Sequence, residues 1–218
     1  MNHPITFHFA VCIDGTKSMA PILDAVKANI EDLIRAPIEA DYTFDYLCLE
    51  DARIKFFVFR DHSIQETDWV SLLEEPDCFD YVKNLVAEGK IEPGYDAMDT
   101  LIRATDAMFP IKLRDYAGLL LFTNSPYFTA DVLHYDYGEF STLDTWWEYW
   151  KKKSYNCGFV KIYAPLPTKT SDEDQSWAEW TNGPSPLYTP INEDSASDVI
   201  ADSIDEWRSC FLDDDRDA

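Results

Sequence analysis

Apolar runs of strand length alternate along this chain with segments whose apolar residues recur every three or four positions. The first run covers about residues 5–13, and the helical pattern after it extends from about Ser18 to Arg35. The same alternation places further strands at 116–122, 157–165 and 187–191, and further helices at about 78–88, 96–108, 142–153 and 195–208. It predicts an α/β fold of three layers, with a doubly wound, mainly parallel sheet of about six strands between helices.

Two apolar runs in the first third of the chain depart from this alternation. Residues 41–50 and 53–60 are separated only by Asp51 and Ala52. A link of two residues closes an antiparallel hairpin but cannot cross over between parallel strands. We therefore expect the sheet to carry one antiparallel strand, placed at an edge.

The sequence contains no internal repeat and no low-complexity linker that would mark a second domain. Residues 1–212 are therefore predicted to form a single domain, and residues 213–218 an acidic, solvated tail. Residues 166–186 are the least patterned stretch of the chain. They predict at most a short helix around Trp177 and Trp180.

Aromatic residues gather in and before the predicted helix at 142–153. The stretch 124–140 carries Tyr127, Phe128, Tyr135, Tyr137 and Phe140. Aromatic side chains in a loop serve either as a recognition rim or as ordinary packing, and both interpretations stay open for this stretch. Within the helix, aromatic residues at helical spacing predict core packing for Trp146, Trp147 and Trp150.

A formal net charge of −23 limits the classes of partner. Nucleic acids and anionic membranes bind basic surfaces, so neither is expected as a partner of this chain. The five cysteines are an odd number without a C-x-x-C pair, which favours buried thiols in a reducing compartment. Since the first residues also lack the pattern of a signal peptide, we expect a cytoplasmic protein.

The first predicted strand ends in the polar sequence DGTKS, residues 14–18. One family with a related strand end is that of the haloacid-dehalogenase-like phosphatases, which start with D-x-D-G-T. Their second motif resembles LLLFTN at 119–124. Their nucleophilic aspartate, however, belongs two residues before Asp14, where this chain has Cys12. Without an attacking carboxylate no phospho-aspartyl intermediate forms, so this is the weaker interpretation.

A second resemblance rests on three motifs that follow one another along the chain. DGTKS at 14–18 resembles a D-x-S-x-S metal motif, FRDH at 59–62 follows an apolar run, and GYDAMD at 94–99 opens a predicted helix. In this order they resemble the von Willebrand factor A (VWA) domain, in the bacterial and intracellular branch that reads D-G-T-G-S-M. The motifs cover residues 5 to about 124, and beyond them the resemblance lies in the order of elements.

This resemblance implies a metal-ion-dependent adhesion site (MIDAS) at the carboxyl ends of the strands. Its residues would be Asp14, Thr16, Ser18, Asp96 and Asn124, with the two hydroxyls binding the ion directly and the aspartates directly or through water. An all-oxygen set of this kind suits Mg²⁺, with Mn²⁺ as the second choice. The remaining position of the ion would accept an acidic residue of a protein partner.

The family resemblance further implies a non-enzymatic adaptor in a bacterial stress-response or defence system. Three residues depart from the family pattern, because Lys17 replaces a glycine, Asn124 replaces an aspartate, and Asp96 replaces the threonine found in integrin-like members. An alternative is therefore a VWA fold with a degenerate metal site that serves only as a structural interaction module. The phosphatase remains as a third interpretation.

Overall fold

The computed structural model describes residues 3–39, 47–89, 95–109, 115–125, 127–128, 143–154, 158–166, 175–177 and 188–212. Within these residues the strands are β1 (His3–Asp14), β2 (Leu47–Arg60), β3 (Ser63–Glu66), β4 (Val70–Ser71), β5 (Tyr116–Phe122), β6 (Tyr127–Phe128), β7 (Gly158–Ala164), β8 (Gln175–Ser176) and β9 (Tyr188–Pro190). The helices are α1 (Ala20–Glu39), α2 (Asp80–Lys83), α3 (Tyr95–Met108), α5 (Leu143–Lys153) and α6 (Ala196–Leu212), with short 3₁₀ helices η1 (Lys17–Met19) and η2 (Pro76–Phe79).

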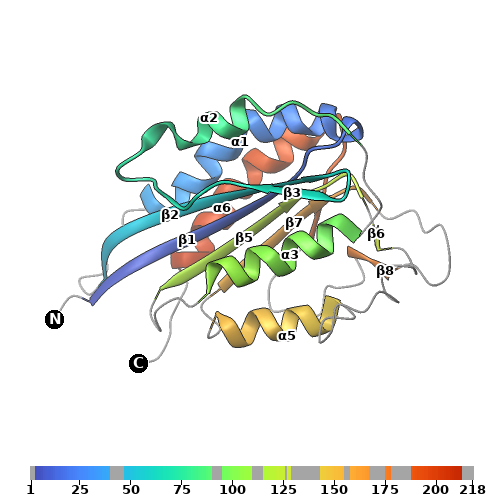
Figure 1. Ribbon diagram of the computed structural model, residues 1–218. Helices are drawn as coiled ribbons and strands as arrows, with labels where there is room; N and C mark the ends of the chain where they lie inside the picture. Colours follow the sequence, from blue (N-terminus) through green and yellow to red (C-terminus); the bar gives the residue numbers. More distant parts are fainter. Residues whose placement is uncertain are drawn as a thin grey trace.

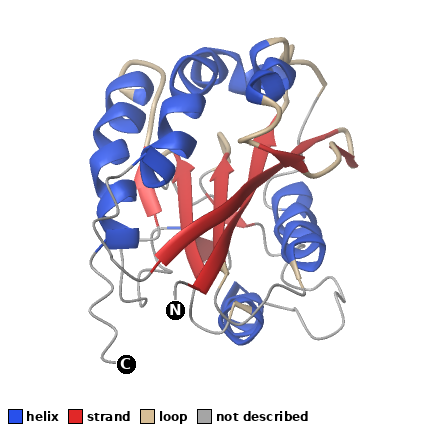
Figure 2. Ribbon diagram, turned by 90° about the vertical axis from the view of Figure 1, so that its left-hand side faces the viewer, coloured by secondary structure: helices blue, strands red, loops and turns tan. Residues whose placement is uncertain are grey.

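The main sheet has the strand order β3-β2-β1-β5-β7-β9, and β4 also pairs with β2 (Figure 1). β2, β1, β5, β7 and β9 run parallel to their neighbours, whereas β3 and β4 are antiparallel to β2. Helices α1, α2 and α6 cover one face of the sheet, and α3 and α5 cover the other (Figures 1 and 2). The predicted three-layer, mainly parallel α/β fold with an antiparallel edge is thus confirmed.

The central strands are apolar on both faces because helices cover both faces. In β1, Phe7, Phe9 and Val11 pack with α1 and α6, while Ala10 and Cys12 face α3 and α5. Strands buried on both sides appear in a sequence as continuous apolar runs. This explains why the pattern predicts β5 with its exact bounds and β1 to within two residues at either end.

Helix α5 confirms part of the prediction for the aromatic residues. Trp146 and Trp150 are fully buried against α3, and Trp147 is half-buried at the border of the same cluster. The indole N–H of Trp146 donates a hydrogen bond to the hydroxyl of Thr105 at 3.0 Å. The question of a recognition rim at 124–140 falls largely on residues outside the described part of the chain.

The predicted hairpin of 41–50 and 53–60 is wrong. Residues 47–60 form the single strand β2, which pairs in parallel with β1 along its length. Asp51 and Ala52 do not form a turn, because they pair with Thr6 and Phe7, and a register shift leaves only Glu50 without a partner residue in β1. The Asp51 carboxylate accepts the Ala52 N–H at 2.8 Å, so the local polar residue stabilises a bulge within the strand. The antiparallel edge comes from β3 and β4.

The helix predicted at 78–88 is also too long. Only η2 and the four residues of α2 are helical there, and residues 84–89 form a turn and an irregular loop. The side-chain amide of Asn84 donates to the carbonyl of Asp80 at 2.8 Å, which satisfies a carbonyl at the helix end. The loop that follows makes tertiary contacts with the end of β1 instead of continuing the helix.

The two residues before Trp177 are extended, whereas Trp177 itself has a 3₁₀ conformation, so the short helix predicted around Trp177 and Trp180 is tested only at its first tryptophan. Gln175 and Ser176 form β8, which pairs antiparallel with β6 in a separate two-stranded sheet. Trp177 follows directly and is fully buried. Trp180 and the predicted tail at 213–218 lie outside the described residues.

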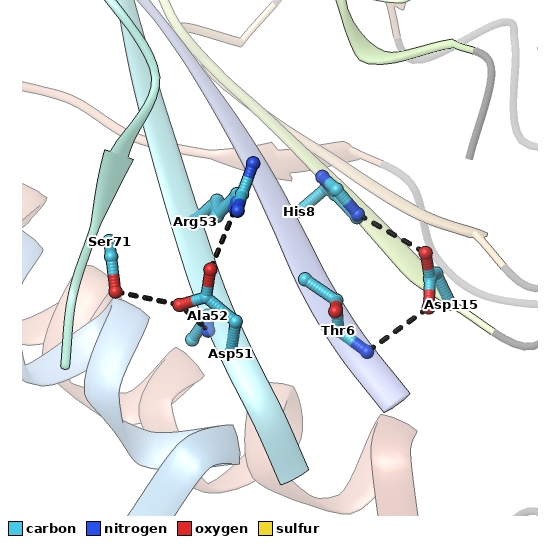
Figure 3. Close-up of polar contacts among 7 residues, drawn as sticks. All are labelled: Thr6, His8, Asp51, Ala52, Arg53, Ser71 and Asp115. Carbon is cyan, nitrogen blue, oxygen red and sulfur yellow. Dashed lines mark hydrogen bonds and ion pairs between the residues drawn. The ribbon is translucent and has the colours of Figure 1, made fainter. Parts of the chain in front are cut away.

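A polar cluster lies on the sheet at the amino ends of β1 and β5 (Figure 3). Asp115 accepts the Thr6 N–H at 3.1 Å and lies 3.4 Å from Nε2 of His8. The His8 ring also contacts Trp69 edge-on at a centroid distance of 5.8 Å. Burial lowers the pKa of His8, and Arg53 acts in the same direction, although Asp115 and Asp51 raise it.

This lowered pKa predicts a loss of stability on acidification. The unfolded chain binds a proton at His8 more readily than the fold does, so stability is lost as pH falls through the ordinary histidine pKa of about 6.5. We expect the free energy of unfolding to decrease more between pH 8 and 5.5 in the wild type than in His8→Gln. Urea titrations at the two pH values measure this, and equal decreases would contradict the assignment to His8.

Candidate metal centre

The candidate centre lies at the carboxyl ends of β1 and β5, which are neighbours in the sheet. Asp14 is the last residue of β1, and Thr123 follows the last residue of β5. The DGTKS loop therefore faces the loop that contains Asn124. Such ends of parallel strands are where open α/β sheets bind their ligands.

The carboxylate of Asp14 is fully buried and accepts hydrogen bonds from both loops. Oδ1 accepts the backbone N–H of Thr16 at 3.0 Å and its hydroxyl at 2.6 Å. Oδ2 accepts the hydroxyl of Thr123 at 3.1 Å and the backbone N–H of Asn124 at 3.3 Å. Asp14 thus joins the end of β1 to the loop that follows β5.

Thr16 and Ser18 bring two hydroxyl oxygens together beside this carboxylate. Their Oγ atoms lie 3.1 Å apart. Thr16 is fully buried and precedes η1, yet its side chain makes no cap hydrogen bond, because the hydroxyl donates to Asp14. Ser18 is exposed, so the pair leads from the buried carboxylate to solvent. The intervening Lys17 is also exposed.

The other two predicted residues are placed less directly. Asn124 is half-buried and reaches Asp14 through its backbone N–H. Asp96 is the second residue of α3, and its side chain lies outside the described part of the structure. The structure therefore brings together the side chains of Asp14, Thr16 and Ser18 and the backbone of Asn124.

The residues present fit a hard divalent cation. Burial raises the pKa of Asp14, while its hydrogen bonds to Thr16, Asn124 and Thr123 lower it in part. A cation near the buried carboxylate would stabilise the charged form that burial disfavours. The described residues contain no group of three His, Cys, Asp or Glu side chains that could hold a metal. The side-chain oxygens that they bring together at this centre are the Asp14 carboxylate and the hydroxyls of Thr16 and Ser18.

Three further residues support the centre and were missed by the sequence analysis. The Thr123 hydroxyl bonds Asp14 and accepts the N–H of Ser125 at 3.0 Å. The indole N–H of Trp177 donates to the Ser125 carbonyl at 2.7 Å. The threonine at the end of LLLFT was a visible signal, because a hydroxyl after a buried strand is a typical ligand or support position. Trp177 gave no comparable signal.

Cys12, which stands where the phosphatase family has its nucleophilic aspartate, is itself poorly suited to act as a nucleophile. Cys12 is fully buried within β1, on the side of the sheet that faces α3 and α5. Burial strongly raises the pKa of its thiol, which suppresses the reactive thiolate.

Comparison with known proteins defines the fold. No protein-family model and no curated protein matched the sequence. Among solved structures, the open conformation of the pilus adhesin SpaC from Lactobacillus rhamnosus GG matches with a TM-score of 0.61 and 11% identity, over 95% of this chain and 30% of that chain. Proximal thread matrix protein 1 from the mussel byssus matches at 0.58 and 12% identity, over 95% of this chain and 47% of that one.

A further structure of the mussel protein, described as having a zinc-occupied MIDAS motif, matches with a TM-score of 0.58 and 12% identity, over 94% of this chain and 46% of that chain. At these identities the likeness shows the fold alone, and the fold is that of the VWA domain. This chain spans less than half the length of each of these solved chains. Among the described residues, no helix is long and apolar enough to cross a bilayer.

Proposed function

We propose that this protein is a non-enzymatic VWA module that binds a protein partner through a divalent metal ion at Asp14, Thr16, Ser18, Asp96 and Asn124. The observation that carries the proposal is the pair of hydroxyl oxygens of Thr16 and Ser18, 3.1 Å apart and next to the buried Asp14 carboxylate. Adjacent oxygens around octahedral Mg²⁺ lie about 3 Å apart, since each Mg–O bond is about 2.1 Å long. Mg²⁺ is therefore the proposed ion, and Mn²⁺ the second choice.

The hydrogen bonds explain how a hydroxyl could serve as a ligand here. A metal-bound hydroxyl becomes more acidic and needs an acceptor for its proton. The Thr16 hydroxyl already donates to Asp14 at 2.6 Å, which leaves its lone pairs for the ion. Asp14 would then act mainly by holding Thr16 and by supplying negative charge close to the ion.

The exposed side of the centre supports a partner that presents an acidic residue. In the proposed ligand set Asp14 and Asp96 supply two negative charges to a doubly charged ion, and Asn124 supplies none. Exposed Ser18 marks the side from which solvent, or a partner, reaches the pair. A carboxylate from the partner would complete the coordination of the ion, whereas nucleic acid or an anionic membrane would be repelled by the strongly acidic chain. A cytoplasmic adaptor role in a bacterial stress-response or defence system belongs to the same proposal.

Thermal melting tests the metal directly. At Mg²⁺ or Mn²⁺ concentrations about 100 times the dissociation constant, linkage stabilises the fold by about 2.7 kcal/mol, which is about 5 to 10 °C for a domain of this size. We expect this shift relative to EDTA in the wild type and its loss in Ser18→Ala. The control is Ser197→Ala, another exposed serine, on α6. No shift in the wild type would indicate a degenerate site, and an equal shift in Ser18→Ala would show that the ion does not bind through this pair of hydroxyls.

A further inference from the structure

The loop at 84–89 holds the metal-binding loop through its backbone. The N–H of Glu88 donates to the carbonyl of Gly15 at 2.8 Å, and the N–H of Lys17 donates to the carbonyl of Gly89 at 3.4 Å. From the other direction, Gly15 donates to the carbonyl of Phe59 at 3.0 Å, which continues the pairing of β1 with β2. The backbone that carries Thr16 and Ser18 is therefore held by β2 on one side and by residues 84–89 on the other.

Arg60, the last residue of β2, ties the same loop to the strand. Its Nη1 donates to the carbonyl of Val86 at 3.0 Å, and its Nη2 pairs with the Glu88 carboxylate at 2.8 Å. The Arg60 side chain is 13% exposed, although that of Glu88 is 58% exposed. Its aliphatic part lies against Gly15, where an added Cβ would be 3.4 Å from Cδ of Arg60.

The carboxylate of Asp61 lies beside Gly89, the last residue of the loop at 84–89. Asp61 and His62 both have left-handed backbones, with φ of 50° and 56°, and form the tight turn between β2 and β3. Gly89 is left-handed too, with φ of 78°, and a Cβ there would lie 2.2 Å from Oδ2 of Asp61. Only glycine leaves the space that the Asp61 carboxylate occupies.

We propose that Arg60 and Asp61 are positioning residues for the metal centre, an inference that rests on the proposed function. They hold residues 84–89 against Gly15 and Lys17, and thereby keep the hydroxyls of Thr16 and Ser18 at the separation that an ion requires. Residues 84–89 have no regular structure that would fix them by themselves. This gives the two central residues of the FRDH sequence, residues 59–62, a role in supporting the loop that carries Thr16 and Ser18.

A simple charge effect and a positioning role predict opposite changes in metal affinity when Arg60 is replaced by methionine. A guanidinium near a cation repels it, so electrostatics alone would make Arg60→Met bind metal more tightly. Loss of a residue that supports the ligands instead weakens metal binding, typically by about tenfold. The direction of the change therefore separates a positioning role from a simple charge effect.

The experiment compares wild type with Arg60→Met, using Arg53→Met as the matched control. Arg53 lies on the same strand and pairs with Asp51, at a distance of 2.7 Å and with its side chain 53% exposed. Calorimetric titration with MnCl₂ is expected to show about tenfold weaker binding in Arg60→Met and no change in Arg53→Met. Unchanged or tighter binding in Arg60→Met would overturn the proposal.

Amide hydrogen exchange in EDTA tests the same inference without metal. In Arg60→Met we expect the N–H groups of Lys17 and Glu88 to exchange on the order of tenfold faster, while those at the centre of β1 stay protected. If the wild type binds no metal, the proposed function fails, but this exchange result still decides whether Arg60 holds the loop. Equal exchange in both proteins would overturn the positioning role.

Asp61 is tested by two substitutions that keep its left-handed turn. Asparagine adopts this conformation readily and preserves the shape of the side chain, whereas glycine adopts it and removes the side chain. We expect Asp61→Gly to speed exchange at Lys17 and weaken Mn²⁺ binding, and Asp61→Asn to do so less. Wild-type exchange and Mn²⁺ binding in Asp61→Gly would remove Asp61 from the proposal.

Discussion

Replacing Asp14 by asparagine is expected to abolish the thermal response to Mg²⁺ while leaving the melting temperature in EDTA equal to, or above, that of the wild type. Burial raises the pKa of Asp14, so the folded protein holds a proton there more readily than the unfolded chain does. The stability linked to this group is then fully present below its ordinary pKa of about 4 and is lost as pH rises from there through the raised pKa of the folded state. At neutral pH the buried charge therefore destabilises the metal-free fold, and an amide removes that charge.

The hydrogen bonds around residue 14 keep the expected gain in stability of Asp14→Asn in EDTA small. The amide oxygen of asparagine can still accept the N–H and the hydroxyl of Thr16, and its NH₂ group can donate to the Thr123 hydroxyl. The N–H of Asn124, however, loses its acceptor, which offsets about 1 kcal/mol of the gain. Metal affinity should fall on the order of 100-fold, because the only described carboxylate at the centre is neutralised and a residue that holds a ligand is changed.

The matched control for this prediction is Asp115→Asn. Asp115 is a second buried aspartate, at the opposite end of β5, where it bonds Thr6 and His8 (Figure 3). Its substitution should leave the Mg²⁺ response at the wild-type value whatever its effect on stability. Differential scanning calorimetry of both variants in EDTA and in Mg²⁺ gives the comparison. A wild-type Mg²⁺ response in Asp14→Asn would contradict the assignment of the ion to this site.

Trp177→Ala is expected to cause the largest loss of stability among these variants. The side chain is fully buried against the α3 and α5 face of the sheet, and its N–H bonds the Ser125 carbonyl. Removing a buried tryptophan typically costs about 4 kcal/mol, which lowers the melting temperature of a domain of this size by about 10 °C. Guanidinium denaturation measures the loss. A decrease below about 1 kcal/mol would show that Trp177 is not part of the core.

Phenylalanine at this position separates packing from the hydrogen bond. Trp177→Phe keeps much of the apolar contact but frees the carbonyl of Ser125, next to the residue that bonds Asp14. We expect a smaller Mg²⁺ response in this variant than in the wild type. Trp146→Phe is the control, because Trp146 is equally buried and bonds Thr105 far along the chain from the centre. Equal Mg²⁺ responses in the two variants would show that Trp177 contributes to core packing but does not support the metal centre.

The elements predicted best are those whose local pattern and tertiary environment agree. β5 at 116–122 and β1 are continuous apolar runs because both of their faces are covered, and α3 follows its helical period almost to the residue. β2 shows the opposite case. Its polar Asp51 reads as a turn, but pairing with β1 on one side and the hydroxyl of Ser71 on the other keeps the strand continuous through a bulge.

The candidate centre divides in the same way. Asp14, Thr16 and Ser18 are neighbours in the sequence, so a single motif reveals them, and the strand order brings Asn124 to them as expected. Thr123, Trp177, Arg60 and Gly89 join the centre only through the packing of distant segments. Their roles depend on which loop lies against which strand end, and this arrangement cannot be predicted from the local sequence pattern.

The sequence by itself determined the alternation of strands and helices, the apolar core of the sheet and the oxygen-bearing side chains of one loop, because each depends on residues that are close along the chain. The tertiary structure decided where the antiparallel edge comes from, how a buried carboxylate joins two loops, and how residues 84–89 hold Gly15 and Lys17. These features arise from contacts between residues far apart in the sequence, whose energies are set only once the sheet has assembled.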